Sequence, residues 1–243
     1  MYADDLQVYL PFAPADCDRA VARVNEDLES ISTWCNSNCL TINPNKSQFM
    51  VIGSPKNIAK LKDINTAILI NGQPITRVDT AKNLGLVIDS NLKFERHIAE
   101  CARNSFYRLK LLHKIRPYLS ERIRITLCEA LVLSRLNYCD TVYGPCLLSR
   151  TSRLIQRVQN SCARFCFTVP PRSHITPYLN DANMLKMEAR RKLHLTTMLF
   201  GVITTMKPKY LYLKLEWARH HSRYPRRELK RPCIAHPFER HSN

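Results

Sequence analysis

Apolar positions in the first third of the chain alternate between helical and strand-like spacing. Ala20, Val24, Leu28 and Ile31 recur three or four residues apart, which predicts a helix over residues 15–37 with Asp16 as its N-cap. Residues 3–10 are rich in Leu, Val and Tyr and predict a strand, as do the apolar segments 48–52 and 82–88. The stretch AILINGQPITRV predicts a hairpin, because Asn71-Gly72 is a favoured turn pair, and the polar residues 56–66 predict a loop or a short helix.

From residue 94 onward the pattern becomes helical. Phe94, Ile98, Ala102 and Leu109 keep helical spacing, and Pro117 is expected to end this helix. Similar patterns predict helices over residues 120–136, 150–167 and 183–205, whereas the Pro- and Arg-rich residues 207–243 predict a poorly ordered tail. The chain is therefore expected to be α+β, with helices and strands mixed over residues 1–93 and a helical part over residues 94–206.

The net charge of the chain indicates which class of partner it could bind. Lys and Arg number 37 against 20 Asp and Glu, a formal net charge of +17, which favours a polyanion such as nucleic acid. A basic surface with no specific partner is the alternative. No apolar run approaches the ~18 residues of a membrane span, so no membrane partner is expected.

The cysteines do not predict a metal site. The first residues lack the features of a signal peptide, so the ten thiols are expected to stay reduced. Cys35/Cys39 and Cys162/Cys166 are CxxxC pairs that lie far apart within apolar sequence. Zinc ribbons prefer two intervening residues and a second matching pair, so these pairs disfavour a structural zinc.

Tyr2-Ala3-Asp4-Asp5 is the most informative short motif of the chain. Two adjacent carboxylates repel each other, so a strand turn that displays both usually has a cation to neutralise them. Mg²⁺ fits, because it prefers oxygen ligands and retains substrate phosphates. By itself, however, an Asp-Asp pair is more often simply solvated.

Four blocks of residues, in order, resemble the reverse transcriptases of jockey-like non-LTR retrotransposons. YADDLQVY is similar to their catalytic motif. A helix that ends in Trp34-Cys35 leads into Leu40, Ile42, Asn43, Lys46 and Ser47 and then FMVIG, which looks like their next motif. Lys82 to Asp89 with Leu92, Phe94 and His97-Ile98 is similar to their YLG..LD..L.W..HI segment, and LNYC followed by Tyr143-Gly144-Pro145 resembles their C-terminal region.

The resemblance implies a partial right-hand polymerase palm followed by an α-helical thumb and connection. Asp4 and Asp5 would hold the catalytic Mg²⁺ ions, and Tyr2, Ala3 and Lys46 would lie near the incoming dNTP. A solvated turn lysine is the alternative for Lys46. The partners would be an RNA template and a DNA primer, with intracellular location and nuclear access for the parent element.

Five further residues are candidates for nucleic-acid contact. Gly85 would allow close approach of the backbone, although a plain β-bulge is an equal alternative. On the predicted thumb, the candidates for phosphate contact are Arg96, Arg103, Lys110 and Lys114. The alternative is the ordinary solvated face of a helical bundle.

The resemblance also implies missing parts. A reverse transcriptase needs a third metal-binding Asp and fingers, both of which precede the catalytic turn, whereas only Met1 precedes Tyr2. We therefore expect a fragment that does not polymerise DNA by itself. The alternative function is a nucleic-acid-binding remnant of the element that has no catalysis.

Overall fold

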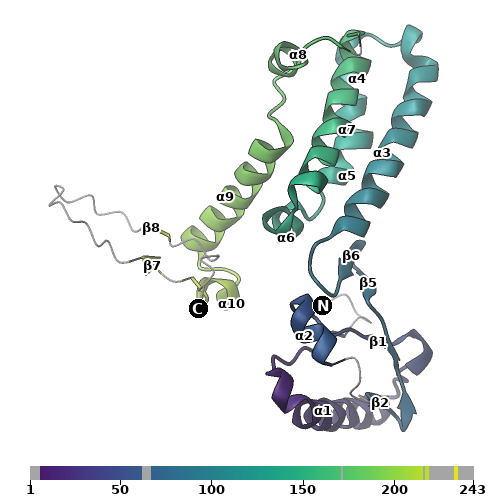
Figure 1. Cartoon of the computed structure of the whole chain (residues 1–243), viewed down its shortest axis with the longest axis vertical. Helices are drawn as coiled ribbons and strands as arrows, with labels where there is room; N and C mark the ends of the chain where they lie inside the picture. The colour runs from purple at the N-terminus through teal and green to yellow at the C-terminus, as the bar shows by residue number, and fades with distance from the viewer. Residues whose placement is uncertain (1–5, 62–66, 171, 216, 219–232, 235–243) are drawn as a thin grey trace, which may run out of the picture. The chain divides into compact units, whose positions relative to one another are not determined.

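Helices dominate the fold, and its strands are short (Figure 1). The structure is a computed structural model that describes residues 6–61, 67–170, 172–215, 217–218 and 233–234. Helix and strand together make the chain an α+β protein. It divides into two compact units, Met1–Glu188 and Ala189–Asn243. The predicted boundaries near residues 93 and 206 stay predictions.

The first part of unit 1 combines two helices with three two-stranded pairings. Its helical elements are η1 (Pro14–Asp16), α1 (Cys17–Ser37), η2 (Pro44–Lys46) and α2 (Pro55–Lys60). Its strands are β1 (Gln48–Phe49), β2 (Leu69–Ile70), β3 (Gln73–Pro74), β4 (Thr76–Arg77), β5 (Thr80–Asn83) and β6 (Leu86–Asp89). β1 pairs with β4 in parallel, whereas β2–β3 and β5–β6 are antiparallel.

One asparagine fixes the β2–β3 hairpin to helix α1. The side chain of Asn25 donates to the carbonyl of Ala67 at 3.2 Å and accepts from the amide of Leu69 at 3.0 Å. The hairpin turns at Asn71-Gly72, where both φ angles are positive, as predicted from this turn pair. Asp16 precedes α1 as predicted, but its side chain makes no capping hydrogen bond.

Three strand predictions were wrong in extent or kind. Residues 6–10 form no strand: Leu6, Val8 and Tyr9 are exposed, so this apolar segment lacks the cover that a strand face needs. The strand predicted over residues 48–52 contains only the two residues of β1, because β4 offers it only two paired positions.

The predicted strand over residues 82–88 is in fact the β5–β6 hairpin. Asn83 pairs with Leu86, so Leu84 and Gly85 form a two-residue turn with φ angles of 44° and 84°. Two positive φ angles are typical of a type I′ turn, whose twist matches the flanking strands. The β-bulge considered for Gly85 is therefore wrong.

The second part of unit 1 is helical. Its elements are α3 (Glu95–Ile115), η3 (Arg116–Tyr118), α4 (Glu121–Leu127), the π-helix η4 (Cys128–Leu133), α5 (Ser134–Asn137), α6 (Asp140–Tyr143), η5 (Gly144–Cys146), α7 (Ser149–Phe167) and α8 (Thr176–Asp181). Helices were predicted over residues 120–136 and 150–167, and they are present. The π segment was not predicted, and Arg108 donates to the carbonyl of Leu131 within it at 3.1 Å.

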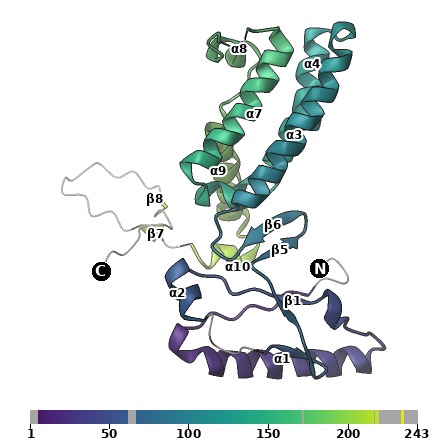
Figure 2. The ribbon, with the colours of Figure 1, turned by 45° about the vertical axis from the view of Figure 1, so that its right-hand side comes forward.

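Helices α3 and α7 run parallel, side by side (Figures 1 and 2). At their first turns, Arg150 pairs with Glu95 at 2.5 Å. At their last turns, the ring of His113 lies edge-on to Phe165 with centroids 4.9 Å apart. The helix formed by residues 121–137 connects the two and runs in the opposite direction, so it packs against both.

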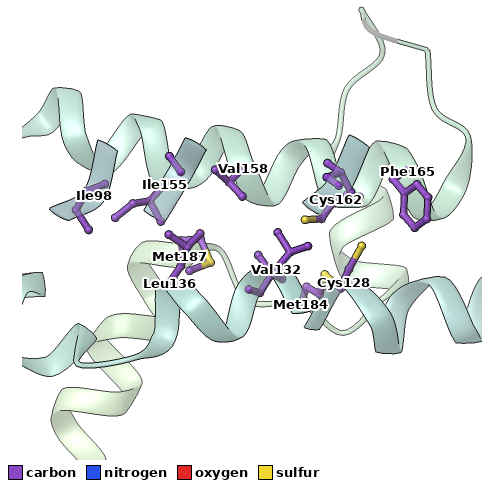
Figure 3. Packing of buried hydrophobic residues seen from close by; sticks show 14 of the residues in the cluster. Ile98, Cys128, Val132, Leu136, Ile155, Val158, Cys162, Phe165, Met184 and Met187 are labelled. Carbon is purple, nitrogen blue, oxygen red and sulfur yellow. The ribbon is translucent and has the colours of Figure 1, made fainter. Parts of the chain in front are cut away.

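The hydrophobic core lies between these three helices (Figure 3). Ile98 comes from α3, Val132 from η4, and Ile155 and Val158 from α7, and all four are fully buried. Three buried cysteines, Cys128, Cys162 and Cys166, share this core, and the Sγ atoms of Cys128 and Cys166 are 3.7 Å apart.

Unit 2 contains most of α9 (Met187–Thr205), then α10 (Lys209–Tyr212) and the antiparallel pair β7 (Trp217–Ala218) and β8 (Cys233–Ile234). The helix predicted over residues 183–205 is thus present but begins four residues later. Most of the tail predicted to be poorly ordered lies outside the described residues. None of the described helices is both long and apolar enough to cross a lipid bilayer.

Candidate nucleic-acid interface

The residues predicted to carry catalysis lie at the beginning of the chain. Tyr2, Ala3, Asp4 and Asp5 fall outside the described residues. Within the described part of the chain, no group of three or more His, Cys, Asp and Glu side chains is placed to hold a metal ion. The geometry of the predicted Mg²⁺ site therefore stays a prediction.

Lys46, the predicted nucleotide-binding lysine, sits on a well-defined turn. The side chain of Asn43 accepts a hydrogen bond from the amide of Asn45 at 3.0 Å, and Ser47 donates to the carbonyl of Asn43 at 3.0 Å. These bonds close the single turn of η2 immediately before β1. The turn leaves Lys46 exposed to solvent, where an anionic ligand could reach it.

The four predicted phosphate-binding residues share one side of α3. They are separated by seven, seven and four residues, spacings that return to the same side of an α-helix, and all four are exposed: Arg96, Arg103, Lys110 and Lys114. We call this set the α3 basic face. Its residues span about 27 Å of helix at 1.5 Å per residue. The opposite side of α3 buries Ile98, Ala102, Leu109 and Leu112, so the core sets the orientation of the basic face.

Members of the α3 basic face differ in what they already contact. Arg96 pairs with Glu100 at 3.4 Å and donates to the hydroxyl of Thr80 on β5 at 3.1 Å. Arg103, Lys110 and Lys114 make no hydrogen bond or ion pair with any described residue. These three cations are therefore available to a ligand, whereas Arg96 also joins the hairpin to the helix.

A second basic row, on α7, was missed by the sequence analysis. Four arginines recur at spacings of three, four and seven residues and lie on the side away from the core: Arg150, Arg153, Arg157 and Arg164. We call them the α7 arginine row. The first three are exposed and Arg164 is half-buried, with a hydrogen bond to the carbonyl of Ser173 at 3.2 Å. The helical recurrence of arginine was the signal that could have identified the row.

Few acids offset these cations. Residues 101–120 contain five Lys and Arg and no Asp or Glu, and residues 141–180 contain five Arg and no acid. Arg116 and Arg124 lie beside the end of α7, where Arg124 donates to the carbonyl of Cys166 at 2.6 Å. Cations at a helix C-terminus are stabilised by its dipole, so part of this charge supports the fold. The remaining charge creates a positive potential that attracts polyanions.

The basic helices are joined to the β5–β6 hairpin by residues of the predicted retrotransposon motifs. The carboxylate of Asp89 accepts hydrogen bonds from the amides of Asn91, Lys93 and Phe94 at 3.1, 2.9 and 2.6 Å. These bonds hold Phe94 in a left-handed conformation, with φ of 55°, while its ring is buried at the start of α3. Asp89 thereby fixes the direction in which α3 leaves the hairpin.

His97 provides a second link between α3 and the hairpin. Its Nδ1 accepts a hydrogen bond from the amide of Val87 on β6 at 3.3 Å, and its Nε2 lies 3.6 Å from the Sγ of Cys101. The ring packs against Tyr143, with centroids 5.6 Å apart. Burial lowers the pKa of His97, against a smaller opposing effect of Glu100. The neutral imidazole that Val87 requires is therefore favoured.

Gly85, a predicted nucleic-acid contact, lies beside Tyr138. A Cβ atom added at Gly85 would lie 3.5 Å from the Tyr138 ring, and the Tyr138 hydroxyl donates to the carbonyl of Leu84 at 2.6 Å. A contact of 3.5 Å is ordinary for a Cβ atom, so the positive φ of Gly85, rather than a close approach to Tyr138, favours glycine at this position. Contact between Gly85 and nucleic acid stays a prediction.

Comparison with known proteins supports the resemblance. No protein-family model matches the chain, and no solved structure matches it. The chain is 24% identical over 196 residues to a protein of Drosophila melanogaster described as "Probable RNA-directed DNA polymerase from transposon BS". The match covers 79% of this chain and 21% of the relative, so the chain spans about a fifth of that protein's length.

The match and the ordered motifs agree. The similarity covers most of the chain, and it extends well beyond the few motif residues that carry the resemblance in the sequence. The predicted resemblance to a transposon RNA-directed DNA polymerase is thereby confirmed. The chain resembles part of a reverse transcriptase of the non-LTR retrotransposon type.

Proposed function

We propose that this chain contributes the rear palm and the thumb of a retrotransposon RNA-directed DNA polymerase, and that its helices hold nucleic acid by the phosphate backbone. In this proposal residues 1–93 are partial palm, residues 94–206 are thumb and connection, and residues 207–243 are a basic tail. The observation that carries the proposal is the presence of two solvent-facing basic rows on two parallel helices.

The two rows suit backbone binding better than base reading. Both rows are linear; the α3 basic face consists of Arg and Lys, and the α7 arginine row of Arg alone, and both residue types bind phosphate oxygens without reading sequence. The core that orients the rows is fully buried and joins α3, α7 and residues 121–137, so the cations sit on a rigid support. A polymerase that copies any template needs this kind of binding.

The catalytic part of the proposal rests on the resemblance. Asp4 and Asp5 are oxygen donors of the kind that Mg²⁺ prefers, and Lys46 lies exposed on its turn. When bound, Mg²⁺ would activate a primer hydroxyl and stabilise the leaving pyrophosphate. Lys46 would place its charge near the phosphates of the incoming dNTP.

Salt-dependent binding tests the interface. Binding of a labelled duplex would be measured by anisotropy over a range of salt concentrations, with the chain, with the triple variant Arg103→Gln/Lys110→Gln/Lys114→Gln, and with Arg153→Gln/Arg157→Gln. Removal of one cation that neutralises a phosphate should reduce the slope of log K against log salt by about 0.9. Both variants should bind more weakly and with a shallower slope.

The matched control is Lys56→Gln/Lys60→Gln, which removes two exposed lysines from α2, outside both rows. An equal effect of this control would show a non-specific charge effect and contradict the proposed interface. Catalysis is tested separately, by primer extension on an RNA template, in which Asp5→Ala should abolish any extension that the chain or a longer form of it supports.

A further inference from the structure

Two tyrosine rings stand exposed among the cations of α3 and the turn that follows it. Tyr107 is 63% exposed and Tyr118, in η3, is 87% exposed. Leu111 and Ile115 add exposed apolar surface between them, at 43% and 46%. Large apolar side chains that gather on one exposed stretch indicate a binding surface more often than scattered ones do.

Cations lie one helical turn on either side of the Tyr107 ring. Arg103 lies four residues before Tyr107 and Lys110 lies three residues after it, so all three occupy the same side of α3. Neither Arg103 nor Lys110 is paired with a described residue. The surface therefore alternates between positive charge and an exposed aromatic face.

This alternation fits unpaired nucleotides better than a duplex. An unpaired base offers its face for stacking on an aromatic ring while its phosphate pairs with a nearby cation. Bases inside a duplex already stack on one another, so a duplex would use only the cations. A protein partner would also suit Leu111 and Ile115, but the absence of acids from residues 101–120 favours a polyanion.

We propose that Tyr107 and Tyr118, together with Arg103 and Lys110, form a stacking platform for the bases of single-stranded nucleic acid. The proposal rests on the proposed function, and it adds a substrate class: an unpaired strand held next to the cations that bind duplex. Tyr107 is the central residue, because it lies on the regular helix between two available cations.

Paired titrations of the 243-residue chain test the platform. A labelled oligothymidylate strand and a labelled duplex of the same length would each be titrated with the chain and with Tyr107→Ala, Tyr107→Phe and Tyr107→Ala/Tyr118→Ala. Tyr107→Ala should weaken single-strand binding about tenfold, since stacking contributes roughly 1–3 kcal/mol per base. Tyr107→Phe should bind like the unaltered chain, and duplex binding should change little in any variant.

Two controls separate stacking from general effects. Tyr210→Ala truncates another exposed tyrosine, 66% exposed, outside the platform, and it should change neither titration. Circular dichroism of Tyr107→Ala should show full helix content, because the side chain is exposed and Ala favours helix. In Tyr107→Trp, addition of the single strand should quench the new tryptophan emission, measured against the emission of the unaltered chain.

Each outcome has a distinct meaning. Equal loss of single-strand and duplex binding in Tyr107→Ala, or no loss in either, would overturn the platform and leave the phosphate-binding interface standing. Concentration-dependent self-association of the chain that Tyr107→Ala removes would also overturn it, in favour of a protein contact. Failure of the unaltered chain to bind either nucleic acid would refute the proposed function itself.

Discussion

The hydroxyl of Tyr138 donates a hydrogen bond of 2.6 Å to the carbonyl of Leu84, 54 residues earlier in the chain. It joins the end of the helix formed by residues 121–137 to the tip of the β5–β6 hairpin. Two motifs that are separate in the sequence, LNYC and the segment around Gly85, therefore meet at one contact. Their joint occurrence has a physical explanation that does not require direct contact with a substrate.

Removal of that hydroxyl should loosen the hairpin. Tyr138→Phe leaves the Leu84 carbonyl without this donor and should lower the free energy of unfolding by about 1 kcal/mol. Hydrogen exchange should accelerate at the amides of β6, while helix α3 stays protected. Tyr210→Phe, in which the altered hydroxyl is exposed and belongs to unit 2, whereas the hairpin belongs to unit 1, serves as the control. Unchanged exchange at β6 in Tyr138→Phe would contradict the link.

The carboxylate of Asp89 should contribute more to the free energy of unfolding than the hydroxyl of Tyr138 does. Asp89→Ala removes the acceptor of three backbone amides and should lower the free energy of unfolding by about 2 kcal/mol. Asp89→Asn keeps one acceptor oxygen, so its free energy of unfolding should fall by less than that of Asp89→Ala. Chemical denaturation of both variants, with Asp79→Ala as an exposed-aspartate control, measures the difference. Equal destabilisation by the Asn and Ala variants would contradict this expectation. It would show that a neutral acceptor oxygen does not stabilise the turn, and that the negative charge of Asp89 is required.

Stability should fall on acidification through His97. Burial lowers the pKa of His97 in the folded chain, so below about pH 6.5 the unfolded chain binds more protons and unfolding is favoured. The contribution of neutral His97 to stability is fully present above the pKa of this residue in the unfolded chain. It is lost as the pH falls towards the lower pKa of His97 in the folded chain. Burial, with Arg116 nearby, lowers the pKa of His113 as well, so its contribution has the same sign.

Denaturation at several pH values, with His97→Asn and His113→Gln, separates these contributions. Asn keeps an acceptor near the position of Nδ1 and does not titrate, so His97→Asn should have a shallower slope of stability against pH below neutrality. The same slope in His97→Asn as in the unaltered chain would show that His97 does not titrate on unfolding.

The three core cysteines should be inert in the folded chain. A hydrogen bond with Cys162 and burial raise the pKa of Cys128, and a hydrogen bond with Cys128 and burial raise the pKa of Cys166. Thiolates are the reactive form, and the Cys162 side chain is fully buried, so alkylation of all three residues should require unfolding. Mass spectrometry after iodoacetamide treatment measures this, with exposed Cys39 as the internal control. Native-state labelling of Cys162 at the rate of Cys39 would contradict the packing.

Periodicity predicted the long helices because each has one buried side and one exposed side. α1, α3, α7 and residues 121–137 all lie where spacing placed them, within a few residues. Arg96, Arg103, Lys110 and Lys114 fall between the apolar positions of α3, and all four are exposed. Periodicity contains no information about partners, however, so it could not show that α7 lies parallel to α3.

The strands were harder to predict, because apolar composition does not establish whether a partner strand is present. Residues 6–10 have strand-like composition but no strand, and residues 82–88 contain a turn that only the φ angles of Leu84 and Gly85 reveal. The π segment depends on backbone hydrogen bonding that no residue pattern specifies. Tyr107 and the α7 arginine row are visible in the sequence, but their spacing is equally typical of an ordinary solvated helix surface.

The parallel arrangement of α3 and α7 also determines when the helical part can form during synthesis. The carboxylate of Glu95 can pair with Arg150 only after 55 further residues have been synthesised. Arg116 can bond to Thr168 only after 52 further residues. Until α7 leaves the ribosome, the part of the apolar side of α3 that α7 covers stays open. A pause of translation between Tyr143 and Ser149 would hold the nascent chain with that side open, at the stage when chaperones bind and aggregation starts.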